Sequence, residues 1–128
     1  MVQSHPSSPK KILLIEDHAD TAKMMRVILE RHGHQVRTAA TAAQAREATA
    51  REKFEVCLCD LRLPDGDGAI LSRELMAEHG LKSICLSGEV TTSDLDPEPD
   101  CAFVAYLTKP IDIAKMLEAI DKVASAKL

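Results

Sequence analysis

The chain has 128 residues, of which 45% are hydrophobic but only 2% aromatic, and its formal net charge is −4. This length suits a single domain with one core built from aliphatic side chains. The scarcity of aromatic rings disfavours stacking platforms for bases or sugars, and without a basic patch direct binding of nucleic acid is not expected.

Residues 1–9 differ in composition from the rest of the chain. They contain three serines and two prolines, which is typical of a disordered leader or of a linker between domains. They lack the apolar core of a signal peptide, and no apolar run in the sequence approaches the ~20 residues of a membrane helix. We therefore expect a cytoplasmic protein without a membrane segment, with one domain over residues 10–125.

The predicted domain begins with a strand and a helix. Residues 11–15 are a continuous aliphatic run, which is typical of a buried strand, and the acids Glu16 and Asp17 follow directly. Apolar residues then recur at helical spacing, namely Met24, Met25, Ile28 and Leu29. Asp17 or Asp20 is expected to cap this helix, and Gly33 to follow its end.

A second strand and a second helix follow. Residues 35–39 are less apolar than the first strand, which predicts a place nearer the edge of a sheet. Residues 42–51 are rich in alanine and are predicted to be helical, with Thr41 as the N-cap.

An apolar run over residues 56–59 ends in a single carboxylate, that of Asp60. Pro64 and two Asp-Gly pairs predict a turn shortly after it. A short apolar run bounded by a turn is typical of a buried parallel strand, and Asp60 would then lie at its carboxyl end. Ligands bind at that edge of open α/β sheets, where a charge requires a compensating cation or a reaction. We therefore hypothesise that Asp60 is a nucleophile that accepts a phosphoryl group.

A third helix and a fourth strand come next. Residues 69–79 are predicted to be a helix that ends at Gly80. Its apolar positions are Ile70, Leu71, Leu75 and Met76. Residues 83–86 are predicted to be a strand, directly before Ser87.

The last part of the domain contains the weakest helical pattern. Two prolines within residues 89–100 exclude a long helix there, so the fourth helix is expected to be short or irregular. Residues 102–107 are predicted to be the fifth strand, and Lys109 follows it. Asp112 is expected to cap the last helix, whose predicted inner face consists of Ile113, Leu117, Ile120 and Ala124.

The alternation of strand and helix, about five times, predicts the fold class. It requires an α/β fold in which a parallel sheet with right-handed crossovers carries helices on both faces.

The four cysteines fall in or beside the predicted strands, at positions 57, 59, 85 and 101. Cys57 and Cys59 are two residues apart and point to one face of a strand, which is not the spacing of a zinc site or a redox motif. We expect buried, reduced thiols that act as small apolar residues.

The predicted strand ends carry polar groups that converge on one edge of the sheet, namely Glu16, Asp17, Asp60, Ser87 and Lys109. Two carboxylates about 4 Å apart repel each other by roughly 4 kcal/mol at an effective dielectric constant near 20. Lys109 offsets part of this charge, and a hard divalent ion with oxygen ligands, such as Mg²⁺, offsets the rest. A carboxylate beside Mg²⁺ and lysine suits phosphoryl transfer, because both cations neutralise the transferring oxygens.

In combination, Glu16-Asp17, Asp60, Ser87 and the segment 106–110 (Tyr-Leu-Thr-Lys-Pro) resemble the receiver domain of two-component response regulators. The resemblance covers about residues 10–125. It implies a flavodoxin-like fold with five parallel strands in the order 2-1-3-4-5. It also implies a phosphorylation-dependent signalling switch that catalyses only its own phosphotransfer and slow autodephosphorylation and is otherwise not an enzyme.

The same resemblance implies a role for each site residue. Asp60 takes a phosphoryl group from a phosphohistidine of a histidine kinase or a histidine phosphotransfer domain. The resemblance implies that Mg²⁺ is held by the carboxylates of Glu16, Asp17 and Asp60 and by the backbone carbonyl of Arg62. Lys109 and Ser87 bind phosphoryl oxygens, Tyr106 changes rotamer as Ser87 moves, and the Lys109–Pro110 peptide is cis.

Several alternatives remain at this point. The chain is either a stand-alone receiver or part of a longer protein, with an effector domain or a hybrid kinase in the same native chain. A pseudo-receiver, a protein-binding module of the same fold that is never phosphorylated, is the main functional alternative. A phosphohydrolase with an Asp nucleophile would need an acid where this chain has Arg62. A flavin site would need a phosphate loop after the first strand, where Glu16 and Asp17 repel phosphate.

Overall fold

Five parallel strands form the central sheet of the computed structural model, which describes residues 9–87 and 103–125. The strands are β1 (Lys11–Ile15), β2 (Gln35–Ala39), β3 (Val56–Asp60), β6 (Ser83–Ser87) and β7 (Phe103–Thr108). Their order is β2-β1-β3-β6-β7, and each neighbouring pair is parallel. This is the order 2-1-3-4-5 expected of a flavodoxin-like sheet, so the predicted fold class is confirmed.

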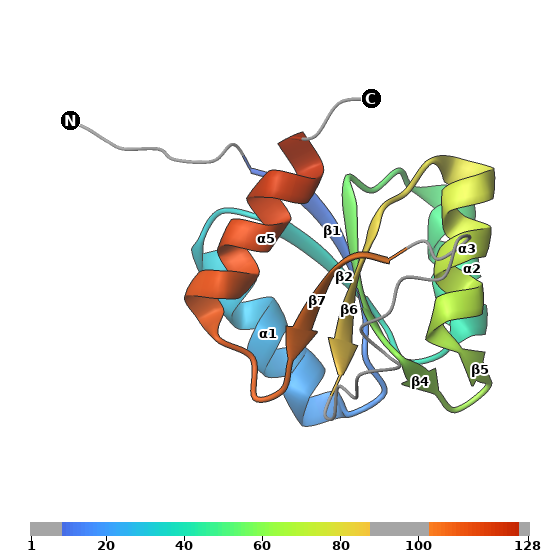
Figure 1. The fold of residues 1–128 in the computed structure, drawn as a ribbon, viewed down its shortest axis with the longest axis horizontal. Helices are drawn as coiled ribbons and strands as arrows, with labels where there is room; N and C mark the ends of the chain where they lie inside the picture. The colour runs from blue at the N-terminus through green and yellow to red at the C-terminus, as the bar shows by residue number, and fades with distance from the viewer. Residues whose placement is uncertain (1–8, 88–102, 126–128) are drawn as a thin grey trace.

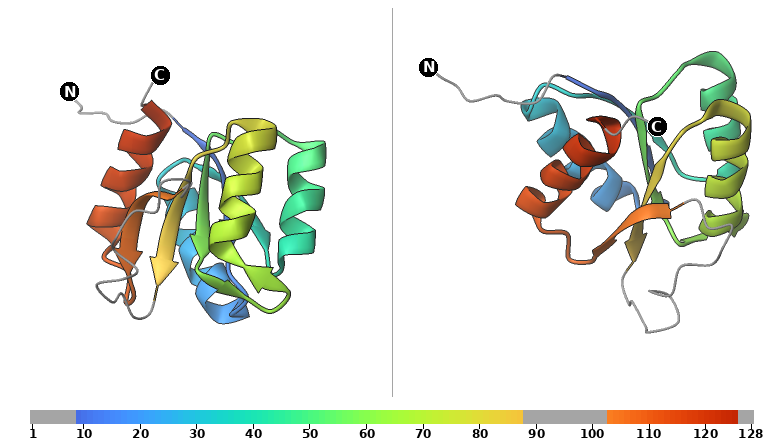
Figure 2. Two further views of the ribbon diagram at one scale, coloured as in Figure 1. Left: turned by 45° about the vertical axis from the view of Figure 1, so that its right-hand side comes forward. Right: turned by 45° about the horizontal axis from the view of Figure 1, so that its top comes forward.

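Helices cover both faces of this sheet. On one face lie α1 (Ala19–Arg31) and α5 (Ile113–Ser125), and on the other lie α2 (Ala42–Arg51) and α3 (Gly68–His79), as Figures 1 and 2 show. A short antiparallel hairpin of β4 (Arg62–Leu63) and β5 (Gly66–Asp67) connects β3 to α3. None of the helices over residues 9–87 and 103–125 is long and apolar enough to cross a membrane. The predicted short fourth helix, residues 89–100, lies outside the described residues.

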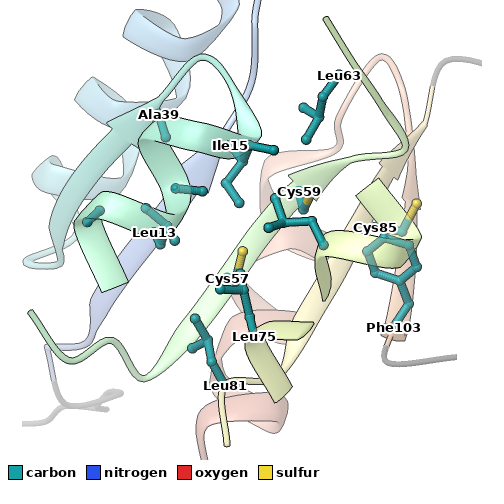
Figure 3. Close-up of a cluster of buried hydrophobic side chains, with 14 residues drawn as sticks. Leu13, Ile15, Ala39, Cys57, Cys59, Leu63, Leu75, Leu81, Cys85 and Phe103 are labelled. Atoms are coloured by element: carbon teal, nitrogen blue, oxygen red, sulfur yellow. The ribbon is translucent and has the colours of Figure 1, made fainter. Parts of the chain in front are cut away.

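The alternation of side chains along the strands divides the core into two layers. Leu13 and Ile15 belong to the cluster on the α2/α3 face (Figure 3), whereas Ile12 and Leu14 belong to the cluster on the α1/α5 face. Every residue of the central strands β3 and β6 is buried, while β2, at the edge of the sheet, is mostly exposed, as its sequence predicts.

Three of the cysteines lie in the layer beneath α2 and α3. Cys57, Cys59 and Cys85 are buried free thiols, as predicted, and Cys101 lies outside the described residues. Burial raises the pKa of Cys57 to about 12. Burial likewise raises the pKa of Cys59, so the thiols of Cys57 and Cys59 are protonated apolar contacts rather than nucleophiles.

Four of the five predicted helix ends are confirmed, including Gly33, which directly follows the C-cap of α1 with a φ of 91°. The Thr41 hydroxyl accepts a hydrogen bond from the backbone N–H of Gln44, Asp112 accepts one from that of Lys115, and Gly80 ends α3 with a φ of 65°. The expected cap of α1 by Asp17 or Asp20 is wrong. The helix begins one residue later than Asp17 could cap and before Asp20, so the N-cap is His18, whose side chain makes no cap hydrogen bond.

Three apolar residues of the predicted helices are exposed, namely Met24, Ile70 and Ile113, of which Ile113 was expected on an inner face. The buried stripe of α1 runs through Ala22, Met25 and Leu29, and Met24 lies about 100° around the helix from Met25 and further from the other two. Ile70 is displaced in the same way from Leu71 and Leu75. In α5 the buried residues are Met116, Ile120 and Val123, so its inner face begins one turn later than predicted.

Candidate functional site

The carboxyl ends of the strands bring the predicted polar residues to one edge of the sheet. Glu16 directly follows β1, Asp60 and Ser87 are the last residues of β3 and β6, and Lys109 directly follows β7. The backbone ladder continues past the strand ends, since the N–H of Glu16 donates to the Ala39 oxygen over 2.9 Å. The N–H of Lys109 likewise donates to the Ser87 oxygen over 2.7 Å. The functional side chains therefore start from a rigid backbone.

The ammonium of Lys109 lies between two carboxylates. Its Nζ is 2.7 Å from Oε1 of Glu16 and 2.9 Å from Oδ1 of Asp60. The side chain of Glu16 is fully buried, that of Asp60 is 10% exposed and that of Lys109 is 25% exposed. Burying a single unpaired charge is energetically unfavourable. The charged form of each group is therefore stabilised by its oppositely charged neighbour.

The two acids differ in how readily they bind a proton. Burial raises the pKa of Asp60, its hydrogen bond with Glu16 raises it further, and the bond from Lys109 only partly opposes this. Burial also raises the pKa of Glu16, but hydrogen bonds with Asp60 and Lys109 outweigh burial and hold that pKa below its usual range. Burial lowers the pKa of Lys109, but its bonds to both acids produce a net increase. Of the two acids, Asp60 therefore binds a proton more readily than Glu16. A cation bound at the site would compete with that proton.

Asp17 lies beside Glu16 together with a residue that was given no role from the sequence, His18. Nδ1 of His18 is 3.3 Å from Oε2 of Glu16 and 3.6 Å from Oδ1 of Asp17. One ligand atom from each of the three residues lies within 4.8 Å of the others. The available sequence signal for a role of His18 was its position directly after Glu16 and Asp17. That position does not indicate the direction in which the imidazole ring points.

Gly68 supports the site through its backbone. A Cβ atom on Gly68 would overlap the backbone oxygen of Asp60 and would lie 3.0 Å from that of Leu61. The N–H of Gly68 donates to the Leu61 oxygen over 2.8 Å, and the Asp67 carboxylate caps α3 through the N–H of Ala69. From the sequence Gly68 was only a turn residue, whereas it permits α3 to begin directly against the end of β3.

Ser87 and Tyr106 lie on the neighbouring strands β6 and β7. Ser87 is buried and is in register with Thr108, and Tyr106 is in register with Cys85. The ring of Tyr106 is half-buried and lies 5.8 Å from that of Phe103 at an angle of 59°. The Lys109–Pro110 peptide is cis, as the resemblance implies.

The charge and chemistry of the site fit a hard divalent cation. Glu16, Asp17 and Asp60 carry up to three negative charges, against the one positive charge of Lys109. Their carboxylate oxygens are ligands that Mg²⁺ prefers. Arg62 is in β4, two residues after Asp60, so its backbone carbonyl belongs to the loop next to the acids.

Comparison with known proteins agrees with this geometry. The sequence profile of the response regulator receiver domain matches residues 12–121. The response regulator protein PilR of Pseudomonas aeruginosa is 30% identical over 114 residues, which are 88% of this chain and 26% of PilR. The chain thus spans about a quarter of the length of this relative.

Solved structures of receiver domains share the fold. A CheY-like receiver domain from Methanospirillum hungatei has a TM-score of 0.81 at 29% identity, covering 91% of this chain and 94% of its own. The receiver domain of the sensor histidine kinase PA1611 from Pseudomonas aeruginosa, with a magnesium ion in its active-site cleft, has a TM-score of 0.81 at 26% identity. The match covers 93% of this chain and 100% of that domain. The profile match and the shared topology lead to one conclusion: this chain belongs to the response regulator receiver domain family.

Proposed function

We propose that this domain is a phosphorylation-dependent switch whose phosphoryl acceptor is Asp60. The observation that carries the proposal is the Lys109 ammonium, held 2.9 Å from Asp60 and 2.7 Å from Glu16 at the carboxyl edge of the sheet. A cation in this position neutralises charge on an oxygen of a phosphoryl group attached to Asp60.

The proposed step is an in-line transfer from a phosphohistidine. A carboxylate oxygen of Asp60 attacks phosphorus, the bond between phosphorus and the imidazole nitrogen breaks, and the electron pair of that bond stays on the imidazole. The residues that would hold Mg²⁺ are Glu16, Asp17 and Asp60, with the backbone carbonyl of Arg62. When bound, the ion supplies charge neutralisation for the phosphoryl oxygens. Lys109, which follows β7, also neutralises charge on these oxygens and orients the acceptor.

The response to phosphorylation is proposed to pass through β6 and β7. A phosphoryl group adds about −1.5 to −2 charges and strong hydrogen-bond acceptors, which the Ser87 hydroxyl can approach. The backbone N–H of Lys109 donates a hydrogen bond to the Ser87 oxygen. A displacement of the end of β6 therefore also displaces the residue that follows β7. We propose that Tyr106 changes rotamer with this shift, so that the surface of β7 differs between the phosphorylated and unphosphorylated forms of Asp60.

The proposed partners follow from this chemistry. The phosphoryl donor is a histidine kinase or a histidine phosphotransfer domain, and the output passes to an effector domain or to a hybrid kinase in the same native chain. We place the domain in the cytoplasm. Apart from its own phosphotransfer and slow autodephosphorylation, we propose no enzymatic turnover.

Beryllofluoride, a phosphoryl mimic, separates this proposal from a pseudo-receiver that only binds proteins. In amide NMR spectra, beryllofluoride with Mg²⁺ is expected to shift the signals around Ser87 and β7, while Mg²⁺ alone shifts mainly those around Glu16 and Asp17. The Asp60→Asn variant is the matched control and should show no beryllofluoride effect. A wild-type spectrum that does not respond to beryllofluoride at saturating Mg²⁺ would favour the pseudo-receiver.

A further inference from the structure

A pocket at the carboxyl end of β2, beside α1, has no role in the proposed function. Its volume is about 310 Å³, and its polar lining includes Lys23 and Arg26 of α1, Thr38 of β2 and Gln44 of α2. We call it the α1/β2 pocket. Ligand sites in open α/β sheets lie outside the carboxyl ends of the strands, and their volumes begin at about 300 Å³. Both its place and its volume are therefore those of a ligand site.

Small side chains leave this pocket open. Ala19 and Ala22 line it from α1, and Ala39 and Ala40 line it from the end of β2. Because each of these residues contributes only a methyl group, the side chains of the neighbouring elements do not fill the space between them.

Arg26 lines the pocket without a counter-ion. Its side chain is partly buried, and its Nε is buried with no hydrogen-bond partner among the described residues. Three more exposed arginines, by contrast, each form an ion pair with a glutamate, namely Arg37, Arg46 and Arg51. A buried donor that stays unpaired is unfavourable. We therefore expect an acceptor from outside the chain to meet Arg26.

Further donors lie beside Arg26. Lys23 is one helical turn away on the same face of α1, and it forms no ion pair within residues 9–87 and 103–125. The Gln44 side-chain oxygen accepts the backbone N–H of Ala40 over 2.8 Å, so its NH₂ group remains as a donor. The Thr38 hydroxyl is a third donor in the lining. The polar groups of this part of the pocket can thus all donate to an anion.

The acids of the functional site line the other end of the pocket. Both oxygens of Glu16 already accept hydrogen bonds, one from Lys109 and the other from the backbone N–H of His18. The Asp17 side chain is 33% exposed, so water and salt screen its charge. Arg26 lies about 10 Å along α1 from Ala19, which is at the acidic end. An anion is therefore attracted to the end of the pocket that contains Lys23 and Arg26.

We infer that the α1/β2 pocket binds a small organic anion through a carboxylate or phosphate group held by Arg26 and Lys23. A guanidinium donates two parallel hydrogen bonds to either group, which matches its planar fork. The inference goes beyond the proposed function and does not depend on it, because neither Asp60 nor Lys109 lines the pocket.

The test uses two probes, inorganic phosphate and acetate, and the full chain without Mg²⁺ at an ionic strength held constant with chloride. The Nε–H group of arginine gives its own signal in ¹⁵N spectra. At least one probe should shift the Arg26 signal in a saturable way, with a dissociation constant on the order of 1 mM. Arg31, an exposed residue in the last turn of the same helix, should show no saturable shift.

Variants of the two arginines provide the matched comparison. Arg26→Gln should weaken binding of the probe at least about tenfold, because it removes a charged hydrogen-bond donor, whereas Arg31→Gln should bind as the wild type does. The backbone amide signals of Ala40 and Gln44 report binding in both variants. Since Nε of Arg26 has no partner within the described residues, Arg26→Gln should fold, which circular dichroism checks.

The outcomes separate this inference from the proposed function. Tighter binding of either probe supports the inference and identifies the group that the pocket prefers. No saturable shift at concentrations far above the millimolar range, or equal binding by Arg26→Gln and the wild type, would overturn it, because Arg26 would then contact only water. A protein that binds the anion but is not phosphorylated at Asp60 would overturn the proposed function alone.

Discussion

The ammonium of Lys109 lies 2.9 Å from a carboxylate oxygen of Asp60, and both side chains are largely shielded from water. The same ammonium is 2.7 Å from Glu16, whose side chain is fully buried. One cation therefore contacts two acids that share a poorly solvated pocket. This arrangement makes the stability of the domain depend on a residue of its functional site.

Replacing Lys109 by alanine should leave a folded but weaker domain. Removing one partner of a buried ion pair costs about 3–5 kcal/mol. Because a quarter of the Lys109 side chain is exposed to screening water, we expect the free energy of unfolding to fall by about 2–3 kcal/mol. Urea unfolding followed by circular dichroism measures this. The exposed lysine of α5, Lys115, is the matched control, and Lys115→Ala should stay within about 0.5 kcal/mol of the wild type.

A double variant tests whether repulsion between the acids causes this loss. The loss of Lys109 raises the pKa of Asp60 further, so the comparison is made at a pH high enough to ionise Asp60, where adding Asp60→Asn to Lys109→Ala removes one of two charges in the same pocket. The double variant should therefore be more stable than Lys109→Ala alone, by about 1 kcal/mol or more. Equal stability of the two proteins would mean that Glu16 and Asp60 do not repel each other through the pocket.

Gly68 provides a steric prediction with an internal control. A methyl group at position 68 would overlap the backbone oxygen of Asp60, which neither β3 nor α3 can move away easily. Gly68→Ala should therefore reduce the free energy of unfolding by about 2–3 kcal/mol, as overpacking does. At Gly66 a Cβ atom would meet nothing within 4 Å, and Gly66→Ala should change stability by less than about 0.5 kcal/mol. Comparable losses in the two variants would contradict the close approach of α3 to Asp60.

His34 makes stability depend on pH at a place far from the site. It is buried, and its Nδ1 accepts a hydrogen bond from the backbone N–H of Lys10 over 3.0 Å, which requires an unprotonated nitrogen. Burial, together with the charges of His32 and Lys10, lowers the pKa of His34. The unfolded chain therefore binds a proton at higher pH than the folded domain does. This stability contribution is complete above the unfolded pKa, about 6.5, and is lost as the pH falls through it toward the folded pKa.

Urea unfolding at about pH 7.5 and pH 5.5 tests this titration. In His34→Asn the amide oxygen can still accept the Lys10 N–H but does not titrate. The loss of stability between the two pH values should thus be smaller in the variant than in the wild type. An identical loss in both proteins would show that His34 does not contribute.

Much of the fold could be predicted because its elements repeat a simple pattern. The strands β1, β3 and β6 are short, mainly apolar runs that stop at or directly before a polar residue, and the sheet order followed from the family resemblance. The phase of the helices was harder to predict, because Met24 beside Met25 and Ile70 beside Leu71 offer two adjacent apolar residues for one inner stripe. Packing against the sheet selects Met25 and Leu71, and this choice depends on the neighbouring strands rather than on the helix alone.

The site was predictable where it depends on the strand ends, which place Glu16, Asp60 and Lys109 at one edge. It was not predictable where it depends on side-chain direction or on close backbone contact. The direction of the His18 ring is determined by the turn between β1 and α1, and the need for glycine at position 68 by how closely α3 approaches β3. Neither property is encoded in residue type or spacing.

The most direct test of the central claim is transfer of a phosphoryl group to Asp60. Wild-type protein incubated with Mg²⁺ and phosphoramidate should gain the mass of one phosphoryl group, and the adduct should be lost in base, as an acyl phosphate is. The Asp60→Asn variant, checked for its fold by circular dichroism, should gain none. Labelling of Asp60→Asn at the wild-type rate, or no labelling of the wild type under conditions that saturate it with Mg²⁺, would contradict the account.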